Sequence, residues 1–289
     1  MRRVFALPVM AVLLLMAACS KDAPTEDTVE PVGDTIRVPA NAPNIQAAID
    51  RAEAGQVVLV SAGAYSGPGN RDINFNGKQI TLTSVDGPEL TIIDCQDTGS
   101  VAHQGFYFGS RETEECVVDG FSVVNAYGPN GSGMGFRSTT PTIRNCIFAR
   151  NEAYASGGAV HCKAASPTFI NCTFVDNSSP AGGAVFLIAG ASPRFERCIL
   201  AFASDGKAVY SSYTGNLPTF VCCNIYGNAE GDWEDDIAEQ ANSAGNLSAD
   251  PLFCDRADGD YRLQGGSPCA PTNNSCSSLI GALNDGCGP

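Results

Sequence analysis

The sequence predicts an all-β fold in which a single chain winds as a parallel β-helix, with about seven turns of about 25 residues each. Two observations carry this prediction. Four prolines recur at intervals of 26, 26 and 25 residues, and four cysteines keep the same spacing: Pro141, Pro167, Pro193 and Pro218, then Cys146, Cys172, Cys198 and Cys223. Helix-forming runs are also sparse, and the repeated segments are rich in Thr, Val, Ile, Phe and Gly, which suits short strands separated by turns.

The first residues predict export. Arg2 and Arg3 precede an apolar run that is too short to span a membrane comfortably, so residues 1–18 are interpreted as a signal peptide. The stretch Leu15–Cys19 resembles a bacterial lipoprotein signal, which implies a lipid on Cys19. An ordinary secretory signal cut nearby is the alternative. Residues 19–35 are polar and acidic, and we interpret them as a disordered tether. The expected location is the bacterial cell envelope, at the outer membrane or cell surface, with membrane contact through the lipid.

The composition and net charge of the chain limit the classes of partner that we expect. The chain of 289 residues has a formal net charge of -14, without the clustered Lys and Arg that nucleic acid requires. We therefore expect no nucleic-acid partner, and we expect a monomer. The repeat array favours one long domain over 36–270, followed by a cysteine-containing tail over 271–289.

The domain is expected to begin with a capping helix within residues 41–55. Ile45, Ala48 and Ile49 fall on one helical face, Asn44 suits the N-cap and Gly55 suits the end of the helix. A strand over 56–65 should follow at once. A short helix with one apolar stripe would cover the open end of the coil.

Equivalent side chains of successive turns should stack inside the coil. The predicted interior columns are Ile143/Phe169/Phe195/Phe220, Cys146/Cys172/Cys198/Cys223 and Phe148/Phe174/Leu200/Ile225. Arg144 and Glu196 should point outward, and Arg144 and Asn145 should turn a corner. Asn151, Asn177 and Asn228 should bond the backbone at another bend.

The cysteines divide into three groups. The four periodic cysteines should be buried free thiols, because neighbouring rungs about 4.8 Å apart are poorly spaced for disulfides and a straight line of thiols does not make a tetrahedral zinc site. Cys95 and Cys116 flank a long excursion and are expected to bridge its base. The loop-rich end should hold at least one disulfide, with the pairing left open, among Cys222, Cys254, Cys269, Cys276 and Cys287.

Three segments resemble right-handed parallel β-helix proteins of the pectin-lyase-like superfamily: PNIQAAIDRAEAGQVVLVSAGAYSG, VVDGFSVVNA and PTFINCTFVDN. The segment ADPLFCDRADGDYRLQGGSPC (249–269) is similar to the closing segment of bacterial surface proteins of that type. The resemblance covers about residues 36–270 and implies a right-handed coil. It selects no activity, because the superfamily includes lyases, hydrolases, esterases, epimerases and non-enzymatic surface proteins.

The candidate functional residues are few. Asp94 and Asp119 align as a two-rung stack with Arg137, Arg144, Arg150, His161 and Lys163 nearby, but no further aspartates extend it and the catalytic motifs of the superfamily do not occur. Catalytic residues therefore remain unassigned. The remaining candidates are His161, Trp233 for stacking on a sugar ring, and Asp255, Asp258 and Asp260 as oxygen ligands for Ca²⁺. No other cofactor is expected.

These observations leave three hypotheses. The first is a non-catalytic, lipid-anchored protein that binds or presents to an extracellular polysaccharide along the flank of the coil. The second is a polysaccharide lyase or glycoside hydrolase with an unrecognised site. The third is a purely structural or adhesive surface protein. A cleft with carboxylates beside Arg or Lys would favour the enzyme, whereas a smooth flank with Asn, Ser and Tyr would favour binding.

Overall fold

The structure is a computed structural model that describes residues 35–96, 101–212 and 217–287. The predicted signal peptide, Cys19 and all but the last residue of the predicted tether lie outside the described residues. Residues 31–289 belong to one compact unit.

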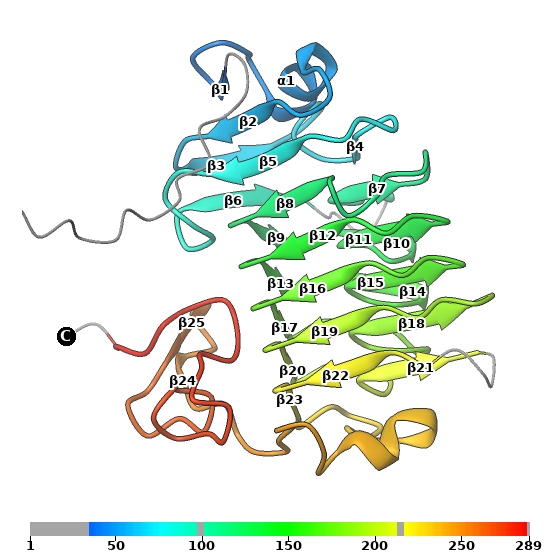
Figure 1. Cartoon of the computed structure of the whole chain (residues 1–289), viewed down its shortest axis with the longest axis vertical. Coiled ribbons are helices and arrows are strands. Elements are labelled where there is room, and N and C mark those ends of the chain that lie inside the picture. The colour runs from blue at the N-terminus through cyan, green and yellow to red at the C-terminus, as the bar shows by residue number, and fades with distance from the viewer. Residues whose placement is uncertain (1–34, 97–100, 213–216, 288–289) are drawn as a thin grey trace, which may run out of the picture. The chain divides into compact units, whose positions relative to one another are not determined.

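The described chain is a parallel β-solenoid whose coils contribute strands to three long sheets (Figure 1). Sheet A comprises β1 (Ile36–Val38), β2 (Val57–Val60), β5 (Thr81–Ser84), β8 (Val117–Asp119), β12 (Thr142–Arg144), β16 (Thr168–Ile170), β19 (Arg194–Glu196) and β22 (Thr219–Val221). Sheet B comprises β3 (Gly63–Ser66), β6 (Thr91–Asp94), β9 (Ser122–Val124), β13 (Ile147–Ala149), β17 (Thr173–Val175), β20 (Ile199–Ala201) and β23 (Asn224–Tyr226). Sheet C comprises β4 (Ile73–Asn74), β7 (Phe106–Phe108), β11 (Met134–Arg137), β15 (Val160–Lys163), β18 (Val185–Ile188) and β21 (Val209–Ser211).

Two smaller pairs complete the strands. β10 (Tyr127–Asn130) and β14 (Glu152–Ser156) pair in parallel beside the coil, with an irregularity in their register. β24 (Phe253–Asp255) and β25 (Asp260–Leu263) form an antiparallel hairpin near the C-terminus. The predicted solenoid of about seven turns is therefore confirmed, with a C-terminal segment that has its own hairpin.

The predicted interior columns are confirmed. Ile143 pairs in register with Phe169, which pairs with Phe195 and then Phe220, and their side chains are buried. Phe169, Phe195 and Phe220 stack with ring centroids 5.0 and 4.8 Å apart. The second column runs Phe148, Phe174, Leu200 and Ile225, also in register and buried. Each such side chain contributes about 1.5–3 kcal/mol by burial, so the coil is held by repetition of a single packing motif.

The corner between sheets A and B is two residues long, and its first residue has left-handed backbone in successive coils. Its column is Gly120, Asn145, Asn171, Arg197 and Cys222, with φ between 49° and 81°. The confirmed corner at Asn145 thus belongs to a column whose side chains lie at the outside of the coil. Asn and Gly suit this backbone region, whereas Arg197 and Cys222 adopt it at some cost.

A buried amide ladder marks the other end of sheet B, as predicted. Asn151 Oδ1 accepts from the backbone N–H of Ala126, and Asn177 Oδ1 accepts from that of Asn151, each at 3.0 Å. The amide of Asn177 donates to the carbonyl of Phe148 at 2.9 Å. Asn228 repeats the arrangement with Ala203 and Leu200. Because a buried backbone group without a partner is costly, this ladder fixes the bend in each coil.

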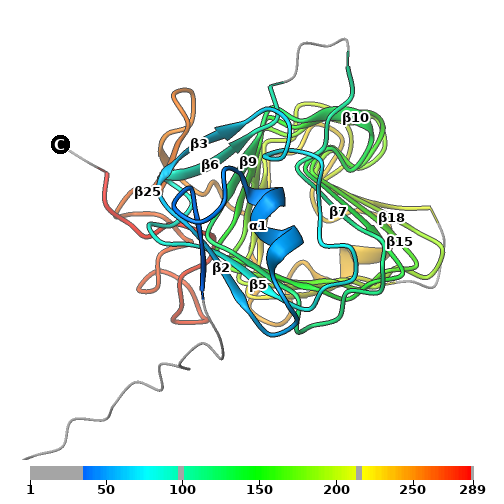
Figure 2. The ribbon, with the colours of Figure 1, turned by 90° about the horizontal axis from the view of Figure 1, so that it is seen from above.

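Both ends of the coil interior are covered. Helix α1 (Ile45–Arg51) is shorter than the predicted range, begins at the N-cap Asn44 and lies over the coil when seen along its axis (Figure 2). Its residues Ile45, Ala48 and Ile49 are buried, which confirms the predicted capping role. At the opposite end, Trp233 packs edge-on against Phe220 with centroids 5.4 Å apart, beside a 3₁₀ helix (Asp235–Gln240).

The cysteines are free or disulfide-bonded as the sequence predicts, with one exception. Eight of the described cysteines are free and buried, including Cys146, Cys172, Cys198 and Cys223, and burial raises the pKa of the Cys146 thiol to about 12. Disulfides join Cys222 to Cys276 and Cys254 to Cys287. The expected bridge between Cys95 and Cys116 is wrong, because both are free thiols buried within the core. Cys222 lies at a corner on the outside of the coil, whereas its neighbour Cys223 is buried in the interior.

The C-terminal segment, which we define as residues 248–287, folds back onto the outer face of sheet B. Phe253, Tyr261, Leu263 and Ile280 form one buried cluster with outward residues of that sheet, among them Ile147, Val175 and Ile199. Figure 2 shows this segment beside sheet B, with sheet C on the other side of the coil. The predicted domain boundary at residue 270 falls inside this segment, since its packing continues beyond that residue.

Candidate binding groove

A groove of about 500 Å³ lies between sheet B and the C-terminal segment. Its floor is an outward column of register partners on β3, β6, β9 and β13: Ala64, Ile92, Ser122 and Ile147. Because side chains alternate along a strand, this column faces away from the interior, where Ile93, Val123 and Phe148 are buried. The floor is therefore apolar except at Ser122.

Two walls enclose this floor. The loop before β6 supplies Pro88 and Glu89, and the Ser122 hydroxyl donates to the Pro88 carbonyl at 2.7 Å. The opposite wall is the tip of the β24–β25 hairpin, with Leu283 beside it. Gly259 at this tip has a φ of 82°, and a side chain there would begin 3.4 Å from the Arg150 guanidinium. The tip therefore approaches the end of β13 closely.

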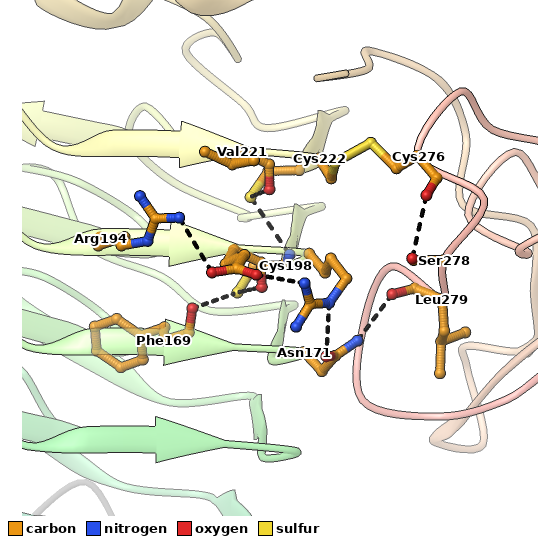
Figure 3. Close-up of polar contacts among 12 residues, drawn as sticks. Phe169, Asn171, Arg194, Cys198, Val221, Cys222, Cys276, Ser278 and Leu279 are labelled. Carbon is orange, nitrogen blue, oxygen red and sulfur yellow. Dashed lines mark hydrogen bonds and ion pairs between the residues drawn. A yellow bond between two sulfur atoms is a disulfide. The ribbon is translucent and has the colours of Figure 1, made fainter. Parts of the chain in front are cut away.

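The C-terminal segment is fastened at the outer corner of the coil (Figure 3). The Asn171 amide donates to the Leu279 carbonyl at 2.8 Å, while its oxygen accepts from Arg197 at 3.0 Å. Two coils further along, Cys222 of the same corner column is joined to Cys276 of the segment by a disulfide. These contacts and the shared apolar cluster fix the hairpin wall of the groove relative to its floor.

Two polar groups in the groove lack partners among the residues that the structure describes. The Tyr261 side chain is only 4% exposed, and its hydroxyl has no hydrogen-bond partner. Burial raises the pKa of Tyr261 to about 12; Arg150 opposes this shift and Asp176 adds to it. Arg150 is exposed at the end of β13 and forms no ion pair or side-chain hydrogen bond within the described part of the chain. The Tyr261 hydroxyl is enclosed by the protein near Asp176, so the exposed Arg150 guanidinium is the donor that this end of the groove offers to a ligand.

The acidic groups of the groove are held differently. Asp94 accepts from the Asn125 amide at 3.0 Å. Asp260 accepts two hydrogen bonds from Arg262, at 2.9 and 2.6 Å, and these hold the pKa of Asp260 below its usual value. Arg262 also lies 3.5 Å from Glu89. The groove thus offers fixed carboxylate acceptors, two guanidinium donors and an apolar floor.

Comparison with known proteins places the fold in a family. A family model for the right-handed β-helix region matches residues 79–246, more than half of the chain. The chain belongs to the right-handed β-helix family. No curated protein matches it.

In this right-handed β-helix, the predicted stack of Asp94 and Asp119 is wrong. Asp94 lies in sheet B and pairs with Val124, whereas Asp119 lies in sheet A and pairs with Thr83 and Arg144. Asp119 accepts from Arg144 at 2.9 Å, so its carboxylate is engaged on a different face. Of these two aspartates, only Asp94 lines the groove.

The other predicted candidates are dispersed over the β-helix. Trp233 is partly buried and donates through Nε1 to the Leu247 carbonyl at 3.1 Å, so it packs at the end of the core and is not an open platform for a sugar. His161 lies on the outer face of sheet C, where its ring stacks on Phe186 with centroids 5.1 Å apart.

The three aspartates of the predicted calcium loop do not face one common site. Asp255 accepts from the backbone of Asp258, whereas Asp260 turns to Arg262. Within 35–96, 101–212 and 217–287, no group of three or more His, Cys, Asp or Glu side chains could hold a metal ion. In the same residues, no helix has the length and apolar character needed to cross a membrane.

Sequence reasoning missed Tyr261 and the hairpin wall. The run DYRL (260–263) alternates polar and apolar residues, which was the available signal for a half-buried strand. Nothing in that run indicates that it packs on a strand more than 100 residues earlier in the chain.

Proposed function

We propose that this chain is a cell-envelope lipoprotein whose β-helix scaffold binds an extracellular polysaccharide in the groove without cleaving it. The observation that carries the proposal is the exposed Arg150 guanidinium, which forms no ion pair among the described residues and lines a groove of about 500 Å³ together with fixed carboxylates. A ligand with hydroxyl groups would accept hydrogen bonds from Arg150 and donate them to the carboxylates.

The composition of the groove supports a sugar ligand. Sugar rings present apolar C–H faces together with hydroxyl groups that donate and accept hydrogen bonds. The apolar floor at Ala64 and Ile92 suits such a face, Asp94 supplies an acceptor, and Arg150 supplies donors.

The protonation states of Asp260 and Arg150 favour binding without cleavage. A glycosidase of the two-carboxylate type needs one carboxyl that remains protonated near neutral pH. Arg262 holds the pKa of Asp260 low, so Asp260 is an ionised acceptor. Arg150 is a poor base because guanidinium groups stay protonated in proteins.

A polysaccharide lyase or glycoside hydrolase is the second candidate. The observation in its favour is that Glu89, Asp94, Asp258 and Asp260 line one cleft together with Arg150 and Arg262. In that case Asp94, which has no cationic partner among the described residues, would be the residue to test first. A purely structural role would leave the groove without a ligand.

The proposal places the mature chain at the outer membrane or cell surface as a monomer, held by a lipid on Cys19. The arginine-flanked apolar leader and the small residues before Cys19 support this. Membership of the pectin-lyase-like superfamily, supported by the opening segment 43–67, is part of the same proposal. Metabolic labelling with a radioactive fatty acid tests the anchor: the wild type should carry label and Cys19→Ala should not.

Binding is tested with a glycan array followed by calorimetric titration of the glycans that score. Arg150→Gln should weaken binding about tenfold or more, because it removes a hydrogen bond from a charged group. Tyr261→Phe should change affinity less than twofold and leave the free energy of unfolding equal or higher, since the hydroxyl is enclosed and forms no hydrogen bond.

Matched controls lie on other faces. Arg37→Gln removes one exposed charge from β1, and Tyr154→Phe removes a hydroxyl from a side chain that is 56% exposed. Neither control should change affinity. No binding by the wild type to any tested glycan, or equal losses in the controls, would refute the groove as a polysaccharide site.

A further inference from the structure

The outer face of sheet C carries a column of aromatic side chains with one gap. The register partners along this column are Asn74, Tyr107, Gly135, His161, Phe186 and Tyr210. His161, Phe186 and Tyr210 stack with successive centroids 5.1 and 5.6 Å apart. Gly135 interrupts the column, so the surface is hollowed between the rings of Tyr107 and His161.

This hollow is a cavity of about 240 Å³. Tyr107 and His161 stand on either side of Gly135, and Pro129 and Asn130 form the wall. Gln104 donates to the carbonyl of Asn130 at 2.8 Å and holds that wall in place. A Cβ atom at Gly135 would lie 3.2 Å from the Tyr107 ring and 3.5 Å from the Gln104 amide, so any larger residue there would crowd the hollow.

Two cations stand beside the hollow. Arg137 and Lys163 are register partners in neighbouring coils, and both line the cavity. Neighbouring strands are about 4.8 Å apart, so both groups reach one ligand group. Both are exposed, and neither forms an ion pair or a side-chain hydrogen bond among the residues that the structure describes.

The charge of this face is the reverse of that of the chain. The whole sequence has 31 acidic and 17 basic residues. The six strands of sheet C, as the structure describes them, contain no Asp or Glu. An anion is therefore repelled by most of the molecule and attracted at this face.

We propose that this hollow is a second binding site, separate from the groove, for a sugar unit that carries a sulfate ester or phosphate group. The sugar ring stacks between Tyr107 and His161, and the tetrahedral oxyanion contacts Arg137 and Lys163. A carboxylate has two oxygens, which one arginine fork engages fully. A phosphate group has three acceptor oxygens and a charge near -2, which matches two cations.

The test uses four polymers on one backbone: dextran sulfate, dextran phosphate, carboxymethyl-dextran and plain dextran. Titration calorimetry at low ionic strength should show binding of the first two, at least tenfold weaker binding of carboxymethyl-dextran and none of plain dextran. Binding of dextran sulfate and dextran phosphate should weaken as salt is raised. Equal affinity for carboxymethyl-dextran, or binding of neither sulfate nor phosphate polymer, overturns the proposal.

Substitutions of the lining residues test whether the charged dextrans bind in this hollow. The double substitution Arg137→Gln with Lys163→Gln should weaken binding of the charged dextrans about a hundredfold, and each single substitution about tenfold. Gly135→Leu should block the hollow independently of charge. Arg37→Gln on sheet A is the matched control and should change affinity less than twofold.

The hollow can be tested independently of the groove. Arg150→Gln and Tyr261→Phe should leave dextran sulfate binding unchanged, because their side chains lie on the opposite side of the coil from sheet C (Figure 2). Unfolding curves of each variant show whether it remains folded. Folded Arg137 and Lys163 variants that bind dextran sulfate like the wild type overturn the assignment.

Discussion

The disulfide between Cys222 and Cys276 should set how often the C-terminal segment detaches from the coil. We consider replacing both cysteines with serine. Their separation is 54 residues. In the chain-entropy description, a cross-link that closes a loop of this length restricts the detached state by about 4 kcal/mol. Because every 1.4 kcal/mol is a factor of ten, the population of the detached segment should rise about a thousandfold.

Amide hydrogen exchange measured by mass spectrometry reports this population directly. Peptides from 248–287 should exchange up to a thousandfold faster in the double serine variant, while peptides from the coil over 117–226 should keep the wild-type rate. Glycan affinity in the groove should fall as well, since the segment carries the hairpin wall with Asp260 and Arg262. Unchanged exchange in 248–287, or equal acceleration in the coil, would refute the reasoning that this bond fastens the segment to the coil.

Three further predictions follow from the coil itself. Asn177→Ala should lower the free energy of unfolding by about 2–4 kcal/mol in urea titrations, because it leaves the backbone N–H of Asn151 and the carbonyl of Phe148 buried without their partners. Trp233→Ala should cost about 3–5 kcal/mol in the same assay without changing glycan affinity, because Trp233 packs on Phe220 at the end of the core. Stability should fall as pH rises above about 9, because burial raises the pKa of Cys146 to about 12 in the folded chain, so the unfolded chain ionises first. The expected slope is about 1.4 kcal/mol per pH unit for that thiol, and Cys146→Ala should have a correspondingly shallower pH dependence.

The coil was predictable because its physical requirement repeats. Each turn needs inward side chains above those of the previous turn, so Cys146, Phe148 and their equivalents recur at a fixed interval. The same logic places Asn151 and Asn177, whose amides satisfy the backbone of neighbouring turns. Repetition makes such positions visible in a single sequence.

Positions outside the repeat were not predictable in this way. The excursion between Cys95 and Cys116 breaks the interval, and a fixed spacing across it aligns Asp94 with Asp119 although they lie in different sheets. The C-terminal segment has no period, so the packing of Tyr261 onto β13 depends on long-range contacts that local pattern cannot encode. The groove forms where this segment meets the outer face of sheet B.

The most direct test of the proposed function is one titration that records binding and cleavage together. A glycan that scores on the array is added to the wild type and to Arg150→Gln, with heat, absorbance at about 235 nm for new double bonds and reducing ends followed in parallel. We predict heat of binding from the wild type, a loss of about tenfold or more in affinity for Arg150→Gln, and no new ends with either. New double bonds or reducing ends formed by the wild type, or equal affinity of the two proteins, would contradict a non-catalytic groove that binds through Arg150.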